Sequence, residues 1–150
     1  MNELDALYRE LILDHSKHPQ HFGLADEDAE PGHSGTSHQK NPVCGDEITL
    51  RARVDGETIA DVTWEGRGCS ISQASASMLA DLVAEEGLSR AEAVTLIEGF
   101  REALRSRGKL ELDEEVYGDA AALSGVSKFS ARVKCAMLAW VALEDAIAKA

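Results

Sequence analysis

The sequence lacks any apolar run that approaches the length of a membrane-spanning helix. Its first residues, MNELDALYRE, also lack the basic flank and the apolar centre of a secretion signal. Basic residues are scarce, with 15 Lys and Arg against 27 Asp and Glu, and the formal net charge is -12. Phosphate backbones and anionic lipids repel so acidic a chain. We therefore expect a cytoplasmic protein that binds neither nucleic acid nor membranes.

Cysteine is scarce as well. The chain has three cysteines, so they cannot all pair with one another, and a reducing compartment would keep them free for metal binding or chemistry. Internal repeats and low-complexity segments are absent. A chain of 150 residues is long enough to form a hydrophobic core without disulfide bonds. We expect one domain that covers residues 1–150.

Helical spacing of apolar residues is present in several parts of the chain. Ser89 and Glu92 have the spacing of a capping box, which opens a helix. Cys69 comes just before a predicted helix, and Cys135 falls in the first turns of the last one, which Ser130 or an earlier serine would cap. The helices are expected at residues 3–14, 70–85, 89–104 and from 130 onward.

A hairpin is predicted between the first two helices. Residues 47–54 alternate between apolar and polar side chains, and residues 58–64 follow after an Asp-Gly turn at 55 and 56. Residues 23–41 have no periodicity and are rich in Gly, Ser, Asp and His, so we expect a long, mobile loop there. The segment from 111 to 127 is ambiguous.

The cysteines lie where thiolates are stabilised. Cys44 and Cys69 each adjoin a glycine in irregular sequence, and Cys135 lies near a helix start, where the helix dipole favours negative charge. Cations occur close to these cysteines in the sequence: Arg67, Arg132 and Lys134. These positions favour reactive or metal-bound sulfur, although Cys135 taken alone also fits a structural thiol in the core.

Asp46, two positions after Cys44, completes a possible zinc site. If Cys44, Asp46, Cys69 and Cys135 converge, they supply three sulfurs and one oxygen, which is a full tetrahedral set for zinc. The complex would carry a formal charge of about -2, which nearby cations would offset. The chain has neither a CxxC nor an HxxxH pair, however, so its spacing also fits free structural thiols.

The histidines give no comparable signal. His15 and His18 could share one helix face, but no carboxylate or cysteine accompanies them at a ligand spacing, so most histidines are expected to be solvated. Trp64 and Trp140 are expected in the core.

Three motifs resemble the SufU branch of the IscU-like iron-sulfur cluster assembly family: NPVCGD at 41–46, GRGCSISQAS at 66–75 and ARVKCAMLAW at 131–140. The segment YRELILDHSKHPQHFG at 8–23 is similar to the N-terminal segment of that family. IscU scaffolds carry a histidine immediately before the third cysteine, where this chain has Lys134, as in the SufU branch.

The resemblance implies an α+β fold, with a small antiparallel sheet of about three strands packed by helices on one side. The third strand is expected between residues 65 and 71. The resemblance also implies that zinc is the cofactor, and the same four side chains reached above would bind it: Cys44, Asp46, Cys69 and Cys135.

Family members of this branch are zinc-dependent sulfurtransferases, whose partners are a SufS-type cysteine desulfurase and downstream iron-sulfur assembly proteins. Cys44 matches the position that accepts the sulfur, after a residue of the desulfurase replaces it at the zinc. Arg132 would orient Asp46 or contact the partner, and Lys134 would support the site. An assembly scaffold with a transient iron-sulfur cluster is the alternative, and a binding module with a purely structural zinc is a third possibility.

Overall fold

The computed structural model describes residues 3–26, 32–42 and 45–150. Its helices and strands follow one another along the chain as α1 (Glu3–Lys17), β1 (His33–Asn41), β2 (Asp46–Asp55), β3 (Thr58–Arg67), α2 (Ser70–Glu86), α3 (Arg90–Arg105), α4 (Glu114–Tyr117), the 3-10 helix η1 (Gly118–Lys128) and α5 (Ser130–Lys149).

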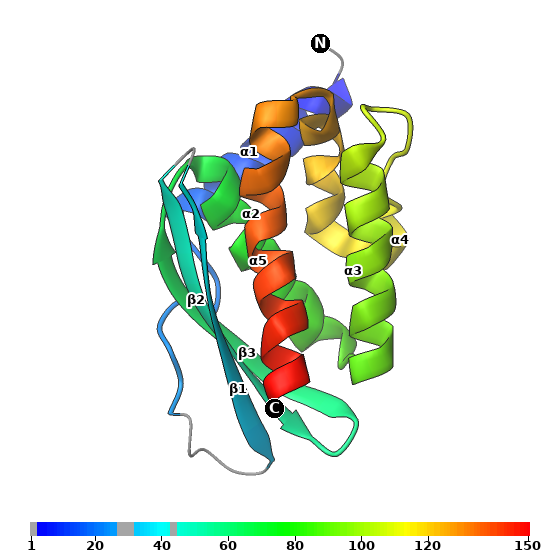
Figure 1. The fold of residues 1–150 in the computed structure, drawn as a ribbon. Coiled ribbons are helices and arrows are strands. Elements are labelled where there is room, and N and C mark those ends of the chain that lie inside the picture. Colours follow the sequence, from blue (N-terminus) through cyan, green and yellow to red (C-terminus); the bar gives the residue numbers. More distant parts are fainter. Residues whose placement is uncertain (1–2, 27–31, 43–44) are drawn as a thin grey trace.

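The strands form one antiparallel sheet in the order β1-β2-β3, and the helices lie on one side of it (Figure 1). Helix α5 packs on β1 and β2, and α2 packs on β3, while α1 and α3 lie against α2 and α5 respectively. The α+β prediction is thereby confirmed. No helix in the described part of the chain is long and apolar enough to span a bilayer.

The β2–β3 hairpin has the pattern that the sequence predicts. The apolar residues of β2 alternate inward, and Leu50 lies opposite the buried Trp64 of β3. The turn lies at Gly56 and Glu57, one position later than predicted, and Gly56 has the positive φ of 64° that glycine adopts without steric cost. Trp64 and Trp140 are both in the core, as expected.

Strand β1 corrects two expectations. Residues 33–41 were expected in a loop but form a strand, and the third strand is this one rather than a strand between 65 and 71, where β3 ends and α2 begins. The inward positions of β1 are Gly35, Ser37 and Asn41 rather than apolar side chains. Helix α5 approaches so closely that a Cβ at Gly35 would overlap the backbone carbonyl of Ala146. The inward positions of this strand therefore need small or polar residues. Because these residues are not apolar, β1 lacks the alternation of apolar and polar side chains by which a strand is predicted.

The helix predictions are correct apart from their ends. Helix α1 continues to Lys17, and α3 has the capping box of Ser89 and Glu92 and ends at Arg105. The prediction that a serine caps the last helix is wrong. Phe129 occupies the cap position without a side-chain hydrogen bond, because η1 runs almost directly into α5.

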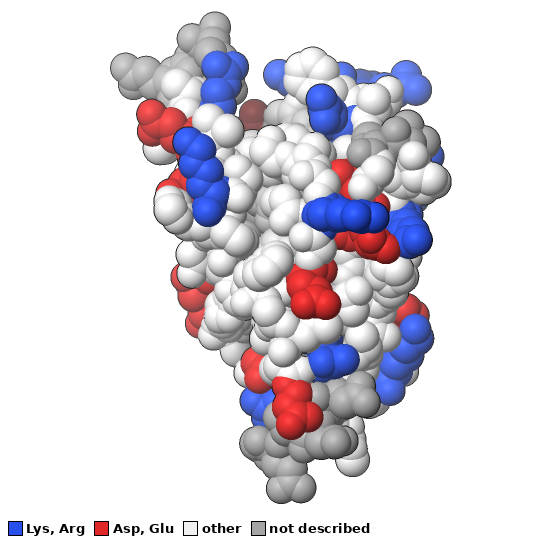
Figure 2. Space-filling model, turned by 90° about the vertical axis from the view of Figure 1, so that its left-hand side faces the viewer, with Lys and Arg blue, Asp and Glu red and all other residues white. Residues whose placement is uncertain are grey.

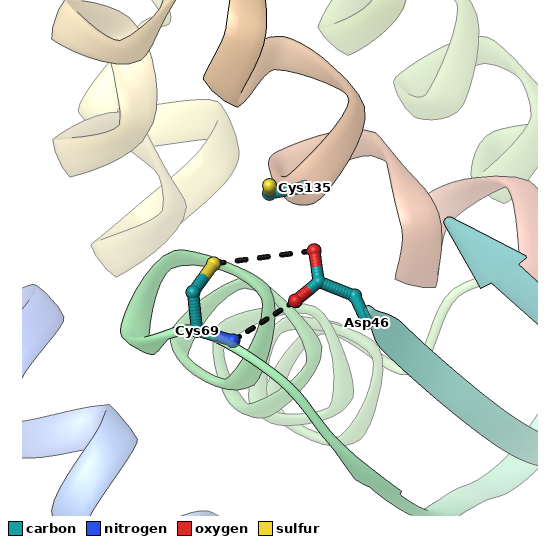
Figure 3. Close-up of side chains that lie close together, drawn as sticks. All are labelled: Asp46, Cys69 and Cys135. Atoms are coloured by element: carbon teal, nitrogen blue, oxygen red, sulfur yellow. Dashed lines mark hydrogen bonds between the residues drawn. The ribbon is translucent and has the colours of Figure 1, made fainter. Parts of the chain in front are cut away.

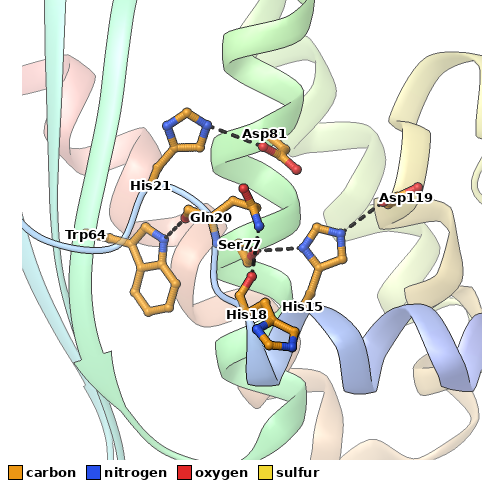
Figure 4. Close-up of polar contacts among 8 residues, drawn as sticks. All are labelled: His15, His18, Gln20, His21, Trp64, Ser77, Asp81 and Asp119. Carbon is orange, nitrogen blue, oxygen red and sulfur yellow. Dashed lines mark hydrogen bonds and ion pairs between the residues drawn. The ribbon is translucent and has the colours of Figure 1, made fainter.

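Helix α1 is tied to α2 and η1 through a buried histidine (Figure 4). His15 pairs through Nδ1 with Ser77 Oγ at 2.7 Å and through Nε2 with Asp119 Oδ2 at 2.9 Å. Ser77 Oγ also accepts a hydrogen bond from the Gln20 backbone N–H at 2.8 Å. The expectation that most histidines are solvated is confirmed, because four of the five are exposed, and His15 is the exception at 6% exposure.

Candidate metal centre

Asp46 and Cys69 come together where β2 begins and where β3 leads into α2 (Figure 3). Cys69 is the residue immediately before α2, as the sequence predicts. Its backbone N–H donates to Asp46 Oδ1 at 2.9 Å, and its Sγ lies 4.0 Å from Asp46 Oδ2. Asp46 is only 1% exposed. A buried carboxylate is thus held at a helix N-terminus, where the backbone N–H groups and the helix dipole favour its negative charge.

Gly68 makes the approach of Asp46 to Cys69 possible. Its φ is 153°, and a Cβ on Gly68 would overlap both Asp46 Oδ1 and Ser72 Oγ. Ser72 in turn donates from Oγ to the Cys69 carbonyl at 3.0 Å, which fixes the first turn of α2. A side chain at position 68 would therefore push the carboxylate away from the helix.

Cys135 is brought to the same place by α5. It lies in the second turn of that helix and is completely buried, and the Asn41 side-chain amide donates to its Sγ at 3.9 Å. One oxygen of Asp46 and the sulfurs of Cys69 and Cys135 lie within 4.8 Å of one another. In Figure 3 the three side chains point toward a common space between β2, α2 and α5.

These donor atoms fit zinc. Zinc binds thiolate sulfur at ~2.3 Å and carboxylate oxygen at ~2.0 to 2.2 Å, so two tetrahedral ligands lie roughly 3.5 to 3.8 Å apart. The observed limit of 4.8 Å exceeds that separation by about 1 Å. Three candidate ligands from distant segments therefore lie close to the required separation, and a tetrahedral site needs a fourth.

The fourth predicted ligand, Cys44, lies outside the described residues, so its assignment stays a prediction. Positions 43 and 44 are flanked by described residues, and the Gly45 N–H donates to the Asn41 carbonyl at 2.9 Å. Asn41 and Asp46 also lie opposite each other in the β1–β2 register. The short connection that carries Cys44 therefore begins at Asn41, which contacts Cys135, and ends at Asp46, which contacts Cys69.

The two residues predicted to support the site, Arg132 and Lys134, are exposed, unlike the buried Asp46 and Cys135. Both lie on the first turns of α5, and the Cys69 N–H orients Asp46 in the way that we had suggested for Arg132. Asn41 and Gly68 were not predicted from the sequence. Both residues lie within cysteine motifs, NPVCGD and GRGC, and this was the only indication of a role in the sequence. The contacts that show their role are with residues of other segments, Cys135 for Asn41 and Asp46 for Gly68.

Cations gather around the sheet end at which β2 begins. Glu47 lies between His38, Lys40 and Arg67, with the His38 contact at 2.7 Å. The hydrogen bond from His38 holds the pKa of Glu47 below its ordinary value, and the charges of Lys40 and Arg67 add to this effect. Figure 2 views the molecule from the sheet side, and its Lys and Arg side chains are more frequent toward the upper end. Glu47, which follows Asp46 in β2, thus has positive charge nearby.

A groove of about 530 Å³ lies beside Cys69. Ser70 and Ile71, which follow Cys69, form part of its wall, and the exposed Phe129 lies at the start of α5. Its apolar lining comes from α1, α2 and the η1–α5 junction: Tyr8, Ile12, Leu13, Ile71, Val126 and Phe129. Its cations are Arg9, Lys128 and Arg132. The groove can receive an apolar segment that carries negative charge.

Comparison with known proteins agrees with the motifs and the fold. Residues 7–136 match the family model described as the NifU-like N terminal domain. The chain is 41% identical over 147 residues to a Bacillus subtilis protein named zinc-dependent sulfurtransferase SufU, covering 97% of this chain and 92% of that protein. It is 40% identical over 147 residues to a Streptococcus pyogenes protein named iron-sulfur cluster assembly scaffold protein IscU, covering 98% and 86%.

A solved structure extends the agreement to three dimensions. A crystal structure from Fervidobacterium islandicum, titled as a candidate iron-sulfur cluster assembly scaffold protein for the SUF system, superimposes with a TM-score of 0.75 at 34% identity. The match covers 92% of this chain and 94% of that chain. Motifs, sheet order and relatives over nearly the full length lead to one conclusion: the chain belongs to the NifU-like N-terminal domain family.

Proposed function

We propose that this protein is a zinc-dependent sulfurtransferase that accepts persulfide sulfur from a SufS-type cysteine desulfurase for iron-sulfur cluster assembly. The observation that carries the proposal is the meeting of Asp46, Cys69 and Cys135 donor atoms within 4.8 Å, in a chain 41% identical to a relative with that name. We also propose that residues 1–150 act as one domain in the cytoplasm.

Three side chains have the role of holding the metal, with Cys44 as the fourth ligand. Zinc, when bound, keeps cysteine sulfurs deprotonated at neutral pH. Asp46 is held by the Cys69 N–H through one oxygen, which leaves its other oxygen facing the sulfurs. Cys135 is fully buried, so the persulfide of another protein cannot reach it. Cys44 and Cys69 remain as candidates. We assign the acceptor role to Cys44, because it matches the acceptor position in the NPVCGD motif of the SufU branch.

The step assigned to Cys44 is thiol–persulfide exchange. The Cys44 thiolate attacks the outer sulfur of a persulfide on the desulfurase, the S–S bond of that persulfide breaks, and the desulfurase cysteine leaves as a thiolate. A new S–S bond joins Cys44 to the transferred sulfur. The exchange needs no external oxidant or reductant, because one S–S bond replaces another.

The groove beside Cys69 is the docking site that we propose for the desulfurase. Phe129, which is 64% exposed, offers an apolar contact, and Lys128 and Arg132 would pair with acidic groups of the partner. A partner segment bound there would lie next to the metal ligands.

The test of the proposal is the Cys44→Ala variant in a desulfurase assay with a SufS-type enzyme and excess cysteine. We expect the zinc-loaded wild type to stimulate sulfide or alanine production, and Cys44→Ala to reduce the rate to that of the desulfurase alone. Mass mapping after turnover should find the mass of one additional sulfur atom on Cys44. Lys149→Ala, at an exposed residue of the opposite end of α5 from Cys135, serves as a control that retains stimulation. Full stimulation by Cys44→Ala would overturn the proposal.

An assembly scaffold is the second candidate, because a relative of 40% identity carries that name. The same ligands would then hold an iron-sulfur cluster. Anaerobic reconstitution with iron and sulfide distinguishes the two functions. A stable visible-absorbing cluster that transfers intact to an acceptor protein, without any stimulation of the desulfurase, would favour the scaffold.

A further inference from the structure

Asn41 contacts the candidate metal centre without being one of its predicted ligands. It is the last residue of β1 and is only 5% exposed. Its side-chain Nδ2 lies 3.9 Å from Cys135 Sγ, and this amide comes from a segment 94 positions away along the chain. The buried end of β1 thus directs a hydrogen-bond donor at the sulfur of Cys135, which is more enclosed than that of Cys69.

The backbone of Asn41 also contacts residues next to the candidate metal centre. Its carbonyl accepts from the Gly45 N–H at 2.9 Å, and its Cα lies opposite that of Asp46 in the sheet. A substitution of the side chain leaves both of these backbone relations available. The contribution of the amide to Cys135 can therefore be measured separately from the closure of the connection between β1 and β2.

An amide donor at this position matches a thiolate better than a thiol. Burying a side-chain amide is unfavourable unless its N–H groups are used, and a neutral thiol sulfur is a weak acceptor, whereas an ionised acceptor strengthens the bond. Asn41 also adds no charge, unlike a lysine or histidine. The donor reduces the charge density on one sulfur of a set that carries several negative charges.

We propose that Asn41 is a positioning residue of the metal centre: its amide orients the Cys135 sulfur and keeps it a ligand while Cys44 accepts sulfur. This inference rests on the proposed function for the role of Cys44, but the hydrogen bond and its effect on metal affinity do not depend on a desulfurase. Hydrogen bonds to ligand atoms typically change metal affinity by about 10- to 100-fold.

Two variants separate the donor from the shape of the side chain. Asn41→Leu keeps a similar volume and removes the amide, whereas Asn41→Asp keeps the outline and presents an acceptor to the sulfur. Ser37→Ala is the matched control, because Ser37 is another buried polar residue on the inward face of β1, outside the Asp46, Cys69 and Cys135 group. All variants are made in the full chain with Cys44 intact.

The experiment measures zinc affinity by competition with a chromophoric chelator, and the thiolate-to-metal absorption band of the cobalt(II)-loaded protein. We expect zinc binding to weaken by about 10- to 100-fold in Asn41→Leu, and more in Asn41→Asp, with a shifted cobalt band in both. Ser37→Ala should match the wild type in affinity and spectrum. Urea unfolding of the metal-free proteins checks that the Asn41 variants fold.

The outcomes distinguish this inference from the proposed function. Wild-type zinc affinity and an unchanged cobalt band in both Asn41 variants would overturn the role of Asn41, even if Cys44→Ala abolished stimulation. Weakened binding with a shifted band supports the role of Asn41, even if Cys44→Ala still stimulated the desulfurase. An equal loss of affinity in Ser37→Ala would also overturn it, because the effect would then be a general consequence of altering β1.

Discussion

A single missing side chain allows the Asp46 carboxylate to reach the start of α2. Gly68 has a positive φ, and the space that a Cβ would occupy is taken by Asp46 Oδ1 and Ser72 Oγ. In this position the carboxylate accepts a hydrogen bond from the Cys69 N–H at 2.9 Å. At the scale of one residue, the position of the predicted ligand Asp46 therefore depends on Gly68, which has no side chain.

Gly68→Ala is expected to weaken zinc binding by about 10- to 100-fold, because the added methyl group displaces the carboxylate from the other donors. Chelator competition with the purified variant measures the change. Gly125→Ala is the matched control, since nothing lies within 4 Å of a Cβ at that position and its φ is not in the left-handed range. Equal zinc affinities for the two variants would show that Asp46 does not need the space at residue 68.

At the scale of elements, α1 depends on polar contacts as well as on its apolar face. Tyr8, Leu11 and Ile12 are only partly buried against the core, whereas His15 is enclosed between Ser77 of α2 and Asp119 of η1. The helix forms one wall of the groove beside Cys69. Its attachment therefore affects the proposed docking site.

His15→Ala should lower the free energy of unfolding of the metal-free protein by about 1 to 3 kcal/mol, because Ser77 and Asp119 lose their partner and a buried cavity is created. Urea denaturation followed by circular dichroism measures the loss. His18→Ala, at an exposed histidine of the same segment, should change the stability by less than about 0.5 kcal/mol. A His15→Ala variant as stable as His18→Ala would contradict the anchoring role.

The helices and strands were predicted correctly where their signal lies in residues that are close together in the sequence. The alternation in β2, the capping box of Ser89 and the apolar spacing of α2 all involve residues a few positions apart. Strand β1 could not be found in this way. Its inward residues are small or polar because α5, about a hundred positions later in the chain, packs directly against them.

At the scale of the whole molecule, the candidate metal centre joins three elements that are remote in sequence. Asp46 begins β2, Cys69 precedes α2 and Cys135 lies in α5, so an ion bound there would link the sheet to two helices. Ligand binding to the native state alone stabilises a protein by mass action. Metal content should thus be visible in global stability.

Removal of zinc with a chelator is expected to lower the melting temperature. At free zinc 100 times the dissociation constant the stabilisation is about 2.7 kcal/mol, which corresponds to roughly 5 to 10 °C for a chain of this size. Differential scanning calorimetry of the zinc-loaded and metal-free proteins measures the shift. An Asp46→Asn variant should melt at nearly the same temperature with and without zinc. The absence of a shift in the wild type would argue against a resident ion.

The order of residues was enough to indicate the cysteine motifs, the acidic character, the central hairpin and most helices, because each of these depends on composition or on nearby positions. The placement of Cys69 ahead of a helix belongs to the same group. Folding in three dimensions settled the rest: β1 as a strand, the burial of His15, and the approach of Asp46, Cys69 and Cys135 with Asn41 behind them. Burial of a polar side chain is favourable only where a partner from elsewhere in the chain meets it, and no local pattern records that partner.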